Sequence, residues 1–68
     1  MGVLEDLADD LARQVLEAET DEDDGLALEV SKVIGVSSQT LQEAYMTAIR
    51  VRRAHKRAQT LIESKRRG

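Results

Sequence analysis

The chain has no glycine or proline from about Ser38 to Arg66, and this stretch constrains the fold more than any other feature. Alanine, arginine, lysine, glutamine, glutamate and leucine dominate it, and these residues favour helix. One helix of about 28 residues would measure roughly 40 Å at 1.5 Å per residue, which is longer than a small domain is wide. We therefore expect something outside the subunit to cover part of this helix.

Apolar positions along this stretch alternate at spacings of three and four, as in the a/d seam of a coiled coil. Tyr45, Ile49 and Leu61 flank the seam and widen it. An antiparallel helix pair or a small bundle therefore fits as well as a parallel two-stranded coil. Packing against the first helix would account for the first half of the seam but not the second. Beyond Leu41, the seam through which we expect self-association consists of Ala44, Ala48, Val51, His55, Ala58 and Ile62.

The composition limits both the core and the chemistry. The 68 residues include no Cys, Phe or Trp and one Tyr, so the core must be aliphatic and thin, which favours a partner subunit. A chain with no cysteine and a single histidine lacks the ligands of the common metal centres, and no nucleophile–base pair or phosphate-binding glycine loop is present. We therefore expect no enzymatic activity, no catalytic residue, no metal site and no cofactor. His55 is expected to be packed or interfacial.

The net charge of −3 hides a separation of charge along the chain. Residues 1–24 carry ten acids and one base, whereas residues 41–68 carry eight bases and two acids. Such asymmetry indicates either that the two ends attract each other, within or between chains, or that the basic half faces a polyanion. No apolar run is long enough to span a membrane, and the N-terminal residues are acidic, so we expect a cytoplasmic protein with no membrane association.

Periodicity predicts an all-α fold, with one small domain over residues 1–68 and three helices at about 3–18, 25–34 and 38–66. Residues 19–25 form a predicted acidic loop, which fails the EF-hand pattern because Thr20 and Ser31 occupy its first and last ligand positions. Asp23 or Asp24 is the expected cap of the second helix. Residues 64–68 are expected to be a frayed basic tail.

The segment between the second and third helices resembles the helix-turn-helix of bacterial transcription regulators, over residues 26–45. Its sequence is Val30-Ser31-Lys32-Val33-Ile34-Gly35-Val36-Ser37-Ser38-Gln39-Thr40-Leu41. Two helices cross closely only over a small side chain, and a sharp turn needs a residue that accepts positive φ. In the resemblance Ser31 is the small residue, Gly35 opens the turn, Val36 plugs it, Ser37 caps the next helix and Leu41 enters the core. Thr40 and Glu43 offer an alternative cap.

This resemblance implies a DNA-binding protein that acts as a homodimer or higher oligomer, such as a transcriptional regulator. Double-stranded DNA would then be the partner, and Gln39 and Gln42 would read adenine edges in the major groove. The residues expected to contact DNA are Lys32, Ser37, Ser38, Gln39, Gln42, Arg50, Arg53 and Arg57.

The alternative is an all-helical interaction or assembly module without DNA contact, such as an adaptor, a phage-encoded inhibitor or a packaging or virion component, which would bind a protein partner. The arginines of the third helix separate the two hypotheses. If they serve DNA binding, Arg50, Arg53 and Arg57 should continue the face of Gln39 and Gln42. If they serve pairing, they should oppose the acids of the first helix, which are Glu5, Asp6, Asp9 and Asp10.

Overall fold

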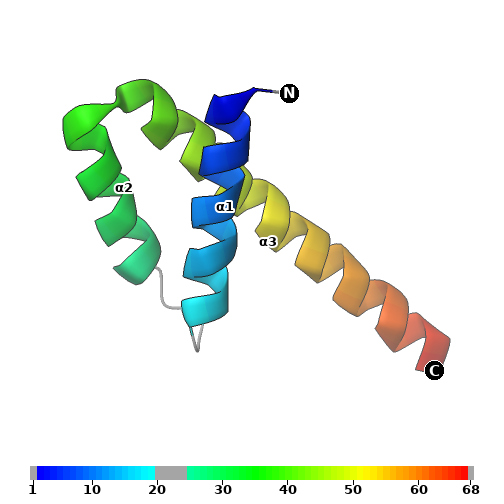
Figure 1. The fold of residues 1–68 in the computed structure, drawn as a ribbon. Helices are drawn as coiled ribbons and strands as arrows, with labels where there is room; N and C mark the ends of the chain where they lie inside the picture. Colours follow the sequence, from blue (N-terminus) through cyan, green and yellow to red (C-terminus); the bar gives the residue numbers. More distant parts are fainter. Residues whose placement is uncertain (1, 20–24, 68) are drawn as a thin grey trace.

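The computed structural model describes residues 2–19 and 25–67, and within these ranges it contains three helices and no strand. Helix α1 spans Val3–Ala18, α2 spans Gly25–Ser37 and α3 spans Gln39–Arg67 (Figure 1). The all-α fold predicted from periodicity is confirmed. None of the described helices is both long enough and apolar enough to cross a membrane.

Helices α1 and α2 lie side by side and both pack against the N-terminal half of α3 (Figure 1). The C-terminal half of α3 projects beyond them, which gives the Cα trace extents of 48 × 28 × 14 Å. The radius of gyration is 13.6 Å, against about 11 Å for a compact domain of this length. A large part of α3 is therefore not covered by the rest of the chain.

The core is built from small side chains around one aromatic ring. Tyr45 is completely buried, and its hydroxyl donates a hydrogen bond to the Ala27 carbonyl at 2.9 Å, which ties α3 to α2. Ile49 lies one turn further along α3 and is also buried. The sequence interpretation placed these two residues on the flank of the seam, whereas they are the centre of the α3 packing face. The other buried apolar residues are Ala8, Ala12 and Val15 of α1 and Ala27 and Ile34 of α2.

The boundary between α2 and α3 differs from the predicted turn. Helix α2 continues through Gly35 to Ser37, and no described glycine has a positive φ. Ser38 is the only described residue between the helices, and it, rather than Ser37, caps α3 by accepting a hydrogen bond from the Leu41 backbone N–H at 3.1 Å. Val36 is 89% exposed, so its side chain does not fill the space between the helices as predicted. Ser31 is buried and Leu41 packs against the core, as expected for these two side chains.

The remaining boundaries are set by local hydrogen bonds. Helix α1 begins with the Gly2 backbone N–H donating to the Glu5 carboxylate at 3.1 Å. It ends at Ala18, and the capping residue Glu19 has a side chain that is 7% exposed rather than part of a solvated loop. Helix α3 continues to Arg67, through most of the segment expected to fray. Of the acidic loop expected at 19–25, residues 20–24, with the Asp23 or Asp24 cap, lie outside the described residues, and Gly25 is the first residue of α2.

Candidate interaction surface on the third helix

The outer half of α3, defined here as residues 50–67, is the most exposed part of the described chain. Every residue from 54 to 67 is exposed, and Val51, Leu61 and Ile62 are 61%, 59% and 52% exposed. The predicted seam is therefore divided. Ala44 and Ala48 are half-buried against the core, whereas Val51, His55, Ala58 and Ile62 lie on the exposed outer half.

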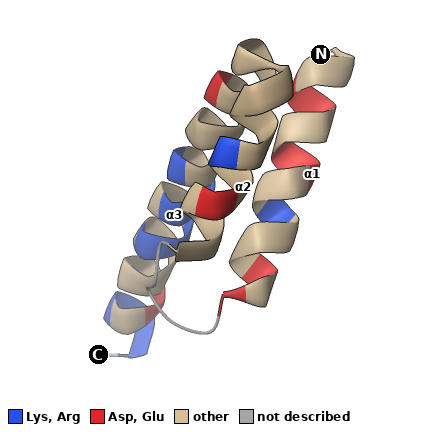
Figure 2. Cartoon of the chain, turned by 90° about the vertical axis from the view of Figure 1, so that its left-hand side faces the viewer, with Lys and Arg blue, Asp and Glu red and all other residues tan. Residues whose placement is uncertain are grey.

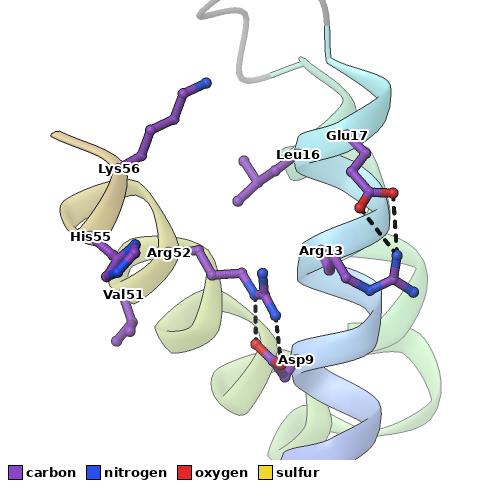
Figure 3. Close-up of a pocket in the computed structure, with 8 residues that line it drawn as sticks. All are labelled: Asp9, Arg13, Leu16, Glu17, Val51, Arg52, His55 and Lys56. Atoms are coloured by element: carbon purple, nitrogen blue, oxygen red, sulfur yellow. Dashed lines mark hydrogen bonds and ion pairs between the residues drawn. The ribbon is translucent and has the colours of Figure 1, made fainter. Parts of the chain in front are cut away.

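An open groove lies where α3 diverges from α1 (Figure 3). Leu16 points from α1 toward α3, and Val51 supplies an apolar side chain from the other wall. This groove, called the α1–α3 groove below, begins at the point where the exposed part of the seam begins. Its lining residues are Asp9, Arg13, Leu16, Glu17, Val51, Arg52, His55 and Lys56.

Ion pairs form the polar rim of this groove. The Arg52 guanidinium holds the Asp9 carboxylate with two hydrogen bonds, Nε to Oδ1 at 2.6 Å and Nη2 to Oδ2 at 2.8 Å (Figure 3). These hydrogen bonds lower the pKa of the Asp9 carboxyl below its ordinary value, and the positive charge of Arg52 adds to the effect. On α1 itself, Arg13 pairs with Asp10 at 2.7 Å and with Glu17 at 3.2 Å.

A second pair between α1 and α3 is more buried. Arg53 Nη2 lies 3.2 Å from Glu19 Oε1, and Glu19 Oε2 is buried without a hydrogen-bond partner. Burial raises the pKa of the neighbouring Tyr45 hydroxyl, and the negative charge of Glu19 raises it further. Sequence reasoning missed this pair because Glu19 was assigned to a solvated loop and Arg53 to DNA. The separation of charge between the two halves was the only signal of such pairing.

The residues predicted to bind DNA do not form one surface. The Gln42 amide turns into α2 and donates to the carbonyl and hydroxyl oxygens of Ser31, at 2.9 and 3.2 Å. Ser38 caps α3, and Arg53 pairs with Glu19. The members of the predicted set that are exposed are Lys32, Ser37, Gln39, Arg50 and Arg57.

The positive charge also lies away from the α2–α3 corner, the name used here for the segment of the predicted helix-turn-helix at residues 26–45. The outer half of α3 carries eight bases and one acid, whereas residues 26–49 carry only Glu29, Lys32 and Glu43. Arg53 is roughly 20 Å along the helix from Gln39 at 1.5 Å per residue. In Figure 2 the blue segments of α3 gather toward its C-terminal end, and red segments recur along α1.

The geometry thus answers the test of the arginines in part. Of the three arginines in the test, Arg53 pairs with an acid of the N-terminal half, but this is Glu19 at the end of α1 and none of the four acids expected. Asp9, which is one of those four, pairs instead with Arg52 of the same chain. Arg50, Lys56 and Arg57 remain exposed. Comparisons of the chain with models of known families, with curated protein sequences and with solved structures found no match. The candidate functional site is therefore the outer half of α3 together with the α1–α3 groove.

Proposed function

We propose that this chain is a helical assembly module that associates with itself through the outer half of α3. The observation that carries the proposal is the exposure of every residue from 54 to 67 in a segment that is nonetheless helical. Isolated helices of about 12–15 residues are marginal in water, because most helix stability in proteins comes from packing an apolar face. A partner helix would supply the packing that the single chain does not.

The apolar side chains on this segment support the same conclusion. Val51, Leu61 and Ile62 are each more than half exposed, although the chain has no Phe or Trp and a single Tyr with which to build a core. Burial of a Val, Leu or Ile side chain contributes about 1.5–3 kcal/mol relative to full exposure. Placing these side chains in an interface would add to a core that is otherwise made of alanine, valine and isoleucine around Tyr45.

The mass of the protein in solution tests this proposal. Light scattering should give at least twice the 7.6 kDa of one chain, and Val51→Glu should reduce it to one chain by placing a charge in the interface. Val51 is 61% exposed, so the variant should still fold. The matched control is Thr60→Glu, because Thr60 is exposed on the same helix but lies off the seam. A native chain that has the mass of a monomer would refute the proposal.

A second candidate function is binding of double-stranded DNA by the outer half of α3. The observation that favours it is the concentration of eight bases and one acid in 18 residues, of which Arg50, Lys56 and Arg57 are exposed. Contacts from these side chains to phosphates would bind without reading sequence. This differs from the helix-turn-helix expectation, because the Gln42 amide already serves the α2–α3 packing.

Binding to a mixed-sequence duplex tests this second function. Counterion release predicts binding at about 50 mM salt and loss near 200 mM. Replacing Arg50 and Arg57 together with Gln should lower the salt slope by about 2, since each phosphate contact contributes about 0.9. Gln39→Ala should leave binding unchanged. If Gln39→Ala alters a sequence preference, the α2–α3 corner is the DNA-binding element, and absence of binding at low salt would eliminate DNA as a partner.

A further inference from the structure

We propose that the occupant of the α1–α3 groove is the outer half of α3 from a second copy of this chain, running antiparallel. In this arrangement Val51 of each copy packs against Ile62 of the other, and His55 packs against Ala58. The inference rests on the proposed self-association and adds its orientation, its register and the surface it uses.

The spacing of the exposed seam carries the register. Val51, His55, Ala58 and Ile62 are separated by four, three and four residues, a spacing that reads the same in both directions. Reversing one copy about the point between residues 56 and 57 therefore places each seam residue opposite another seam residue. Ala58 is small and leaves room for the imidazole of His55 opposite it. No other antiparallel register aligns all four positions.

The α1–α3 groove supplies the second observation. Val51 and His55 line its α3 side, and Leu16 lines its α1 side (Figure 3). In the antiparallel register, Ile62 and Ala58 of the second copy arrive at these two residues, so Ile62 also reaches Leu16. In a parallel pair, the groove would receive Val51 of the second copy, and Ile62 would lie beyond the groove against only its own equivalent. Antiparallel docking thus covers more of the exposed apolar surface.

The distribution of charge favours the same orientation. Five of the bases on the outer half lie between residues 50 and 57, whereas residues 58–64 carry only one charge, Glu63. The antiparallel register places residues 50–57 opposite residues 56–63, so the basic clusters overlap only at Lys56 and Arg57. A parallel pair would place every base beside its equivalent, which is unfavourable for like charges.

Disulfide cross-linking tests the orientation, because the chain contains no cysteine that would interfere. The two variants are Val51→Cys and Ile62→Cys, oxidised separately and as a mixture. Antiparallel docking places residue 51 beside residue 62 of the other copy, but separates residue 51 from its own equivalent by 11 positions, or roughly 16 Å. Disulfides form when the two Cα atoms are within about 7 Å. We expect the mixed 51–62 cross-link in the mixture and essentially no cross-link with either variant alone.

Each other outcome overturns a defined part of the account. Cross-linking of each variant with itself would show a parallel pair, which contradicts the orientation but keeps self-association. A native dimer mass without any cross-link would show that the copies meet at another surface. A monomer mass would refute both this inference and the proposed function. Thr60→Cys, which lies off the seam, is the control for random collision and should not cross-link with either variant.

Discussion

The Gln42 side chain fixes the crossing of α2 and α3 by donating to both the carbonyl and the hydroxyl oxygen of Ser31. Gly35 makes this contact possible. A Cβ atom at position 35 would lie 2.5 Å from Gln42 Nε2 and 2.8 Å from Gln42 Cδ. The glycine therefore provides space for a side chain from α3 and does not provide a left-handed turn. Helix α2 continues past Gly35 to Ser37.

A double-mutant cycle between Gly35 and Gln42 should show coupling. In a Gln42→Ala background, Gly35→Ala should stabilise the fold by up to about 1 kcal/mol, because alanine favours helix more than glycine does. In the native background, the new methyl group should displace the Gln42 amide from Ser31 and cancel most of that gain. Urea unfolding of the four proteins measures both effects. Equal effects of Gly35→Ala in the two backgrounds would contradict the proposed role of the glycine.

Tyr45→Phe should destabilise the fold by about 1 kcal/mol, since it removes a buried hydrogen bond but keeps the aromatic ring. The lost bond is the one from the Tyr45 hydroxyl to the Ala27 carbonyl at 2.9 Å. The midpoint of urea unfolding should fall, while the helix content measured by circular dichroism stays the same. An unchanged or higher midpoint would show that this hydrogen bond does not stabilise the α2–α3 contact.

The Asp9–Arg52 pair should make the free energy of unfolding depend on pH in the acid range. The pKa of Asp9 is lowered in the folded state from its ordinary value of 3.8. The stabilisation that the ionised Asp9 gives the fold is therefore complete at pH values above 3.8. It is lost as pH falls through the lower folded pKa, because the unfolded state then binds the proton more readily. Unfolding followed from pH 6 down to about pH 2 should lose less stability for Asp9→Asn than for the native chain. Asp6→Asn, another exposed carboxylate of α1, is the control, and identical profiles for native and Asp9→Asn proteins would contradict the pair.

Arg53→Gln should destabilise the chain, because it leaves the nearly buried carboxylate of Glu19 without its opposite charge. Breaking a buried ion pair costs about 3–5 kcal/mol, and the partial exposure of Arg53 reduces the expected cost to about 1–3 kcal/mol. Arg57→Gln, which changes an exposed arginine on the same helix, should shift stability by less than about 0.5 kcal/mol. Similar thermal unfolding midpoints for the two variants would show that the Glu19 pair is not structural.

The sequence predicted the helices well because they depend on local periodicity. Alternating apolar spacings located α1 and α2, and the absence of glycine and proline after Ser38 predicted the length of α3. The division of the seam was also anticipated, since packing against α1 could account only for its first half. Ala44 and Ala48 do lie against the core, and the seam residues from Val51 onward are exposed.

The details of the α2–α3 corner were not predictable from local pattern, because they depend on contacts between distant residues. A glycine at position 35 is compatible with a turn and also with close approach of another side chain. Only the position of the Gln42 side chain, seven residues later in the sequence, decides between them. Likewise, Glu19 looked like one acid among many until the fold brought it to Arg53, 34 residues away. Gln42 is engaged with Ser31, and Arg53 is engaged with Glu19. Both side chains are therefore less available for the DNA contacts predicted for them.

The most direct test of the account is the light-scattering mass of the native chain compared with that of Val51→Glu, measured at several concentrations and at two salt concentrations without DNA. The account predicts at least twice 7.6 kDa for the native chain and for Thr60→Glu, and the mass of a single chain for Val51→Glu. A native chain that stays at 7.6 kDa throughout, or a Val51→Glu variant that keeps the native mass, would contradict the role assigned to the outer half of α3.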